Sequence, residues 1–83
     1  MQIKLKLYAS LGEYLPDNAE KHTTQLTVSS DETAFSVLEK FNVPKESAHL
    51  VLLNGIYLGP DERHIPKFND GDTLSVWPPV AGG

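Results

Sequence analysis

Cysteine is absent from this sequence of 83 residues, and no apolar run approaches the roughly 18–20 residues of a membrane span. Without cysteine the chain has no disulfide framework, no cysteine-ligated zinc site and no thiol nucleophile. The N-terminal segment alternates polar and apolar side chains, which does not fit the apolar centre of a signal peptide. Only seven Lys and Arg residues stand against eleven Asp and Glu residues, which argues against nucleic acid as a partner. These absences predict a soluble, cytoplasmic protein that binds neither nucleic acid nor membrane.

The apolar pattern predicts one small α+β domain built on a sheet. Five segments have the pattern of strands: 2–8, 23–29, 50–53, 56–58 and 73–77. In the first, Ile3, Leu5 and Leu7 alternate with polar residues, so we expect them to face a core. The run 50–53 is apolar throughout, which indicates a strand covered on both faces. Asn54-Gly55 follows it at once and predicts a tight hairpin turn.

One long helix is expected between the second and third strands. Its apolar stripe has the spacing i, i+3, i+4, i+7 and consists of Ala34, Val37, Leu38 and Phe41. Ser30, Asp31 and Thr33 are each able to cap its first turn, and the sequence does not choose among them. A weaker pattern indicates a short helix at 9–15. The element order suits a mixed sheet of four to five strands with the long helix packed across one face, over residues 1–78.

Nothing within this domain has the pattern of an active site. The three histidines, His22, His49 and His64, fall in different loops without the spacing of metal ligands, so no metal is expected. Asp70 and Asp72 lack the further ligands of a calcium loop and predict a plain turn. The serines have no nucleophile motif around them, and no glycine-rich phosphate loop is present. We therefore expect no catalytic residue of the chain's own.

The C-terminal residues 79–83 are predicted to form a flexible tail. Pro78 and Pro79 favour an extended exit from the last strand, and four further residues add a reach of roughly 13 Å. Gly82 and Gly83 have no Cβ atom, so their backbone fits a slot too narrow for a side chain. Taken alone, a Gly-Gly ending is more typical of a functionless chain end than of a reactive one.

The ending is accompanied by other distinctive segments. The final hexapeptide Pro78-Pro79-Val80-Ala81-Gly82-Gly83 follows an alternating strand that begins after Asp70-Gly71-Asp72. In this hexapeptide and in residues 3–11, 33–41 and 52–55, the chain resembles the MoaD/ThiS family of sulfur carriers, most of all the small subunit of molybdopterin synthase. It departs from the family at 10–13, where many members have an arginine, and in the short stretch 42–49. Both departures leave open which pathway is served.

The resemblance implies a ubiquitin-like β-grasp fold and a chemistry centred on Gly83. A ubiquitin-activating-enzyme-like adenylyltransferase would use ATP to adenylate Gly83, and a persulfide-bearing protein would convert it to a thiocarboxylate. Val80, Ala81 and Gly82 would thread the tail into the large subunit of molybdopterin synthase, where the sulfur enters the precursor of the molybdenum or tungsten cofactor. The chain would bind no cofactor itself and would act as a co-substrate rather than as an enzyme.

A partner-docking face is predicted from strand parity. If Leu7 and Val76 face the helix, Tyr8 and Trp77 point to the opposite face, and Tyr57 joins them from the return strand. Pro78 and Pro79 continue this face toward the tail. Large aromatics on the exposed face of a small domain indicate an interface, although isolated surface aromatics are the alternative.

Three other functions stay open at this stage. The thiocarboxylate would also serve thiamine synthesis or tRNA thiolation. Alternatively, the chain would be a ubiquitin-like modifier that is joined through Gly83 to lysines of other proteins. A bare interaction domain with an inert tail is the third alternative.

Overall fold

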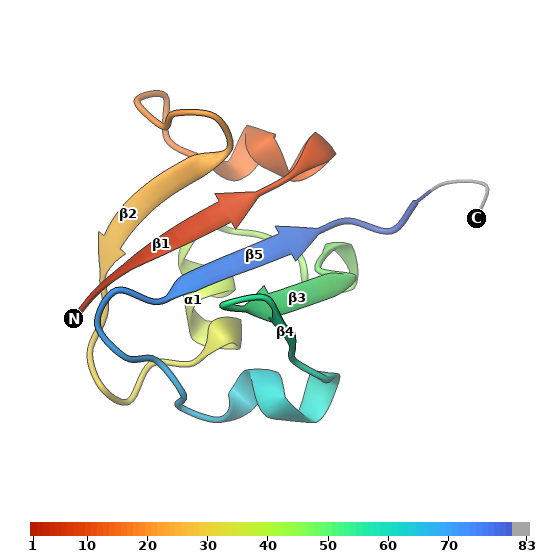
Figure 1. Ribbon diagram of the computed structural model, residues 1–83. Coiled ribbons are helices and arrows are strands. Elements are labelled where there is room, and N and C mark those ends of the chain that lie inside the picture. Colours follow the sequence, from red (N-terminus) through yellow and green to blue (C-terminus); the bar gives the residue numbers. More distant parts are fainter. Residues whose placement is uncertain (81–83) are drawn as a thin grey trace.

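The computed structural model describes residues 1–80. Its strands form one mixed sheet in the order β2-β1-β5-β3-β4 (Figure 1). Their bounds are β1 (Gln2–Leu7), β2 (Thr23–Thr27), β3 (Leu50–Leu53), β4 (Ile56–Tyr57) and β5 (Thr73–Trp77). β1 and β5 are parallel neighbours inside the sheet, and all other strand pairs are antiparallel. The expected mixed sheet is therefore confirmed, with five strands.

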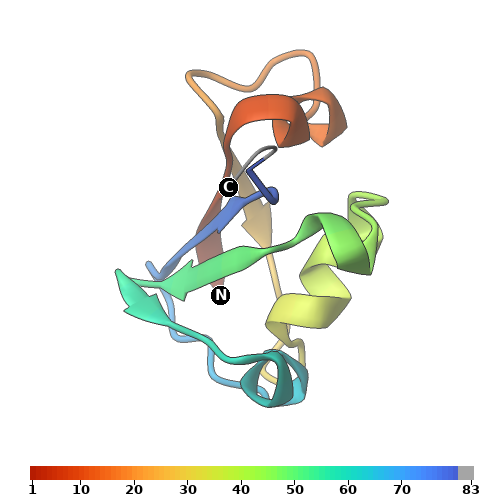
Figure 2. The same cartoon turned by 90° about the vertical axis from the view of Figure 1, so that its right-hand side faces the viewer.

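One α-helix and three 3₁₀ helices connect the strands. α1 (Ala34–Lys40) lies across one face of the sheet (Figure 2), whereas η1 (Ala9–Tyr14), η2 (Lys45–Ser47) and η3 (Pro60–His64) are shorter turns of helix. With seven residues, α1 does not confirm the long helix that was expected. It ends early because Asn42 turns the chain into the left-handed region, at φ 61°, and Pro44 disfavours helical backbone just after it. No helix within residues 1–80 has the length and apolarity needed to cross a membrane.

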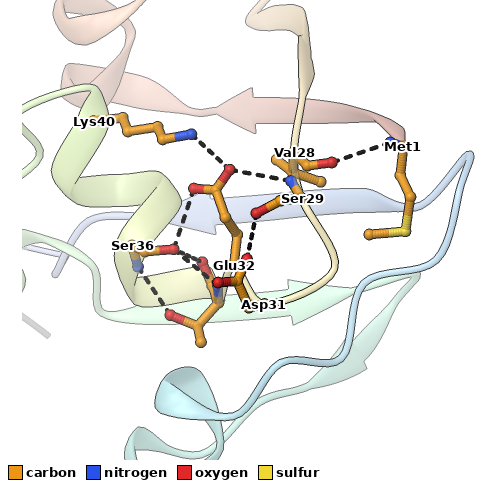
Figure 3. A network of polar contacts seen from close by, with 8 residues as sticks. Met1, Val28, Ser29, Asp31, Glu32, Ser36 and Lys40 are labelled. Carbon is orange, nitrogen blue, oxygen red and sulfur yellow. Dashed lines mark hydrogen bonds and ion pairs between the residues drawn. The ribbon is translucent and has the colours of Figure 1, made fainter.

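A network of polar contacts fixes the start of α1 (Figure 3). Of the three possible caps, Thr33 is the one used: its Oγ1 accepts a hydrogen bond from the Ser36 N–H at 3.0 Å, and the Ser36 Oγ accepts one from the Thr33 N–H at 2.8 Å. Such a reciprocal capping box satisfies two N–H groups that have no partner within the helix. Glu32 accepts from Lys40 Nζ at 2.6 Å and from the Ser29 N–H at 3.3 Å, so it ties both ends of α1 to the end of β2.

The core lies between α1 and the sheet face that the alternation predicted. Ile3, Leu5 and Leu7 of β1 are at most 1% exposed, as are Leu74 and Val76 of β5. They pack with Ala34, Val37 and Leu38 of α1 in one hydrophobic cluster. Burial of each large aliphatic side chain contributes about 1.5–3 kcal/mol, so this layer supplies much of the stability.

The opposite face of the sheet, here called the open face, is not covered by a helix. The expectation that β3 is buried on both sides is therefore wrong: Val51 is fully buried, whereas Leu50 is 37% exposed. Register places Leu50 beside Trp77 and Leu52 beside Ser75, both on the open face. An apolar run without alternation carries no signal for which of its faces is covered.

The hairpin predicted at Asn54-Gly55 is present between β3 and β4. Both residues have positive φ, 51° and 83°. The Asn54 side chain also reaches the loop before β5: its Nδ2 donates to Asp72 Oδ1 at 2.9 Å, and its Oδ1 accepts from the Thr73 N–H at 2.9 Å. The turn residue thereby fixes the entry of β5 into the sheet.

Candidate functional site

The tail leaves the sheet from the end of β5, an interior strand. The Trp77 carbonyl accepts a hydrogen bond from the His49 N–H at 3.0 Å, and the Val76 carbonyl accepts one from the Tyr8 N–H at 3.0 Å. Beyond these two bonds Pro78 and Pro79 have no N–H groups, so the ladder cannot continue. The chain accordingly runs away from the body of the domain (Figure 1), and Val80 is 77% exposed.

Two of the predicted docking residues form an aromatic stack at the root of this tail. The rings of Tyr8 and Trp77 are nearly parallel, with centroids 4.4 Å apart and 3° between their planes. The ring of His22 stacks on Tyr8 at 5.5 Å. The stack thus joins residues next to β1, β2 and β5 on the open face. An aromatic pair of this kind contributes about 0.5–1.5 kcal/mol beyond its burial.

Apolar side chains of β3 and β4 extend this surface on one side. Leu50 lies beside Trp77, and Leu52 pairs with Tyr57, which is 52% exposed. Tyr57 shares the open face with Trp77 but lies two strands away from it, as the order β5-β3-β4 requires. Pro78 is half-buried and Pro79 is exposed. Of the predicted docking residues, Tyr8, Tyr57 and Trp77 therefore lie on one face, and the role of the whole set in docking stays a prediction.

Unfavourable backbone conformations lie next to the stack. Ala9, Lys21 and His22 have φ values of 52°, 43° and 67°. The left-handed region costs a residue with a side chain roughly 1–2 kcal/mol, and asparagine tolerates it best. Apart from these three, the residues of this kind within 1–80 are the asparagines at 42 and 54. Strain of this kind concentrates at functional sites, and here it lies at residues that belong to or adjoin the contact between Tyr8 and His22.

Arg63 of η3 supports the tail root from the other side. Its guanidinium donates to three backbone carbonyls: Leu58 at 3.1 Å, Ala48 at 3.0 Å and His49 at 3.3 Å. His49 is the residue whose N–H holds the Trp77 carbonyl. The peptide unit between Ala48 and His49 therefore links β5 to η3, because its N–H donates to Trp77 and its carbonyl accepts from Arg63.

Other features within residues 1–80 do not form a site for chemistry. The three histidines do not come together, and no three His, Asp or Glu side chains in this range are placed to hold a metal. A small pocket of about 40 Å³ between α1, η2 and η3 is far below the size of a usual ligand site, which is roughly 300–1,000 Å³. Ala81, Gly82 and Gly83, the predicted centre of the chemistry, lie outside the described residues.

Within residues 1–80, the carboxyl groups with lowered pKa values lie at helix starts. The Lys40 ammonium lowers the pKa of Glu32, and a hydrogen bond from the Ser29 hydroxyl lowers the pKa of Asp31. The Gly59 N–H, with help from Lys67, lowers the pKa of Glu62. Each of these groups has a structural partner that explains its shift.

Comparison with known families places the chain. Residues 1–82 match the family described as Mut7-C ubiquitin. The chain belongs to the Mut7-C ubiquitin family. No curated protein matches it.

Solved structures show that this member of the Mut7-C ubiquitin family has a ubiquitin-like β-grasp fold. The HVO 2177 protein of Haloferax volcanii is 25% identical, with a TM-score of 0.77 over 100% of this chain and 87% of that one. SAMP1 of Haloferax volcanii is 24% identical, with a TM-score of 0.68 and full coverage of both chains. A chain from the complex of subunits 1 and 2 of molybdopterin-converting factor of Helicobacter pylori is 19% identical, with a TM-score of 0.59 and full coverage of both. The expected fold is confirmed, and so is the likeness to the molybdopterin synthase small subunit.

Three residues of the site were missed by sequence reasoning. Leu50 was assigned to a strand buried on both faces, and His22 was treated as a scattered surface histidine. Arg63 received no role, because its partners are backbone carbonyls that leave no trace in the sequence. The sequence did contain a signal for Leu50. Val76 and Trp77 of the neighbouring strand point to opposite faces, and antiparallel pairing places Leu50 on the same face as its partner Trp77.

Proposed function

We propose that the chain is a ubiquitin-like sulfur carrier whose C-terminal Gly83 is adenylated and converted to a thiocarboxylate. The observation that carries the proposal is the exit of the tail from an interior strand, beside an exposed aromatic surface. Pro78 and Pro79 end the ladder, and Val80 is 77% exposed. A tail that is held at Trp77 and leaves the body of the domain over Pro78–Val80 can enter the active site of a partner that binds the open face. The β-grasp neighbours support this assignment.

The chemistry follows from the poor reactivity of a carboxylate. A ubiquitin-activating-enzyme-like adenylyltransferase joins the Gly83 carboxylate to AMP and releases pyrophosphate from ATP. The terminal sulfur of a persulfide protein then displaces AMP, and a second thiol cleaves the acyl disulfide to leave the thiocarboxylate. The present chain supplies the carboxyl group and the docking surface, while its partners supply the acid–base groups. It is in this sense a co-substrate rather than a catalyst.

We propose that the acceptor of the sulfur is the pterin precursor in molybdopterin synthesis. The neighbour from Helicobacter pylori comes from a complex of two subunits of molybdopterin-converting factor, and it covers this chain fully. By analogy the large subunit of a molybdopterin synthase would receive Val80, Ala81 and Gly82 in a narrow channel. Two consecutive glycines allow the backbone to enter such a channel because they carry no Cβ atom.

A second candidate is a protein modifier that is joined through Gly83 to lysines. One neighbour, seen in two crystal structures, favours it: the small archaeal modifier protein 1 (SAMP1) of Haloferax volcanii, which is 24% identical to this chain. Both candidates share the adenylation of Gly83 and differ in the group that attacks next. A persulfide gives the carrier, and a lysine amine gives the modifier.

Intact-mass spectrometry tests the shared step and the branch after it. The mass of the purified protein is measured first, which checks that Gly83 carries the terminal carboxylate. Incubation with ATP, the adenylyltransferase of the source organism and a persulfide donor should then exchange one oxygen for one sulfur, and fragment ions should place the change on Gly83. Deletion of Gly83 should abolish the exchange and leave the melting temperature unchanged.

The outcomes separate the candidates. Sulfur exchange with transfer to a pterin precursor in the presence of the synthase large subunit supports the carrier. Isopeptide bonds between Gly83 and lysines of other proteins, without stable thiocarboxylate, support the modifier. Equal sulfuration of a variant whose C-terminus is blocked by a tag would show that the terminal carboxylate is not the reacting group.

A further inference from the structure

The charged side chains are distributed unevenly over the two faces of the sheet. None of the eleven Asp and Glu residues lies in a strand, and the charged strand residues are Lys4 and Lys6 of β1. Both point to the open face, because Ile3, Leu5 and Leu7 point to the core. An acidic protein with net charge −4 therefore presents a positively charged strand on its open face.

Neither of these two lysines forms an ion pair among the residues that the structure describes. Lys4 is flanked in register by Gln25 and Thr73, and Lys6 by Thr23 and Ser75, all of them uncharged. The ion pairs found within residues 1–80 join Lys40 to Glu32 and Lys67 to Glu62, on the helical connections. Two carboxylates lie at the borders of this part of the sheet: Asp70 Oδ1 accepts a hydrogen bond from the Gln2 N–H at 2.7 Å, and Glu20 bridges Thr23 at the outer edge of β2.

The turn before β2 reaches the aromatic stack. Lys21 is exposed and precedes His22, whose ring stacks on Tyr8. The open face therefore has two chemically different sides, one on each side of the stack. Leu50, Leu52 and Tyr57 make the β3–β4 side apolar, whereas Lys4 and Lys6 make the β1–β2 side cationic.

We infer that the open face docks a protein partner whose contact surface is apolar at its centre and carries carboxylates on the side that faces Lys4 and Lys6. This inference rests on the proposed function, since the partner is the enzyme that activates Gly83. Apolar contact with Trp77 supplies affinity, and the charges on one side fix the rotation of the partner about that contact. Correct rotation matters because the tail after Pro79 reaches only about 13 Å.

The experiment titrates the adenylyltransferase of the source organism with the double variant Lys4→Gln/Lys6→Gln. Calorimetry gives the Kd, and ATP–pyrophosphate exchange gives the KM for the carrier. Each exposed charge pair is worth about 0.2–1 kcal/mol, so the loss of two pairs should raise both constants about two- to thirtyfold at low salt. The difference from wild type should shrink at about 0.5 M salt, where charges are screened beyond about 4 Å. The kcat should not change, since neither lysine touches the reacting carboxyl group.

Matched variants separate a charge effect from a general one. Lys45→Gln removes the same charge from η2, away from the open face, and should leave the Kd unchanged. Lys4→Arg/Lys6→Arg keeps the charge and should retain wild-type affinity. An unchanged Kd and salt dependence for the glutamine variant would overturn the inference, as would a complete lack of binding by wild type. Binding by wild type without any pyrophosphate exchange would instead refute the proposed adenylation while leaving the charge comparison measurable.

Discussion

Replacement of Arg63 by methionine is the sharpest test of how the tail root is held. Methionine keeps an unbranched apolar stem of similar length but removes all three guanidinium hydrogen bonds. The carbonyls of Leu58 and Ala48, at 3.1 and 3.0 Å, then lose a charged donor in a partly buried position. The third bond, to His49, is longer at 3.3 Å and exposed, so we give it little weight.

The expected loss follows from these two bonds. A hydrogen bond to a charged group contributes about 1.5–3 kcal/mol when it is well buried, and partial burial reduces this value. We therefore expect Arg63→Met to lower the free energy of unfolding by about 2–4 kcal/mol. Domains of this size have a total of about 4–12 kcal/mol, so the change removes a large share. The melting temperature should fall by about 10–20 °C.

Urea unfolding of wild type, Arg63→Met and Arg63→Lys measures the effect. The lysine variant should recover part of the loss, because one ammonium can reach one or two of the carbonyls but cannot span all three. Amide hydrogen exchange adds a local readout: protection of the His49 N–H, which holds the Trp77 carbonyl, should fall in Arg63→Met. A methionine variant within about 0.5 kcal/mol of wild type, typical of a surface substitution, would refute the reasoning.

Three further predictions concern the core, the docking face and pH. Leu5→Ala should lower the free energy of unfolding by about 2–5 kcal/mol because it leaves a cavity in a fully buried layer, whereas Lys4→Ala on the open face should change it by no more than about 0.5 kcal/mol. Thermal unfolding compares the two variants, and a harmless Leu5→Ala would contradict the assigned faces. Trp77→Ala should weaken binding of the adenylyltransferase about thirtyfold or more, which titration calorimetry measures, and wild-type affinity would remove the stack from the docking surface. Glu32→Gln should reduce the decrease of the free energy of unfolding in acid. The Lys40 ammonium lowers the pKa of Glu32 in the folded protein, so the ionised Glu32 stabilises the fold fully above the unfolded pKa of about 4.3. This stabilisation disappears as the pH falls through the folded pKa, and the glutamine variant lacks it at every pH. Urea unfolding at a series of pH values checks this, and parallel curves for the two proteins would contradict it.

Alternation made the faces of two strands predictable from the sequence. Leu5 and Lys4 lie on opposite faces as expected, because the side chains of a strand have a period of two that survives in any sheet. The same rule placed Tyr8 and Trp77 together on the open face before their contact was known. Local chemistry also identified the turn at Asn54-Gly55, where both residues tolerate positive φ.

Other features depend on contacts that no local pattern carries. The turn at Lys21-His22 has left-handed backbone without a glycine or an asparagine, so nothing in the residue types announces it. The exposure of Leu50 depends on which face of the sheet α1 covers. An unbroken apolar run does not indicate this, because it places apolar side chains on both faces. Gly83, the predicted reactive end, lies outside the described residues, so its proposed chemistry rests on the resemblance.

The parallel pairing of β1 with β5 has a consequence for the timing of folding. This pairing joins Lys4 to Thr73 and Leu7 to Val76, residues from the first and last strands of the domain, so the centre of the sheet cannot form until the segment up to Trp77 has been synthesised. Contacts between such distant segments are slow to close. The Tyr8–Trp77 stack depends on the same pairing, since its two rings come from the two strands. A partner that binds this stack consequently distinguishes a completely folded chain from a nascent or partly unfolded one.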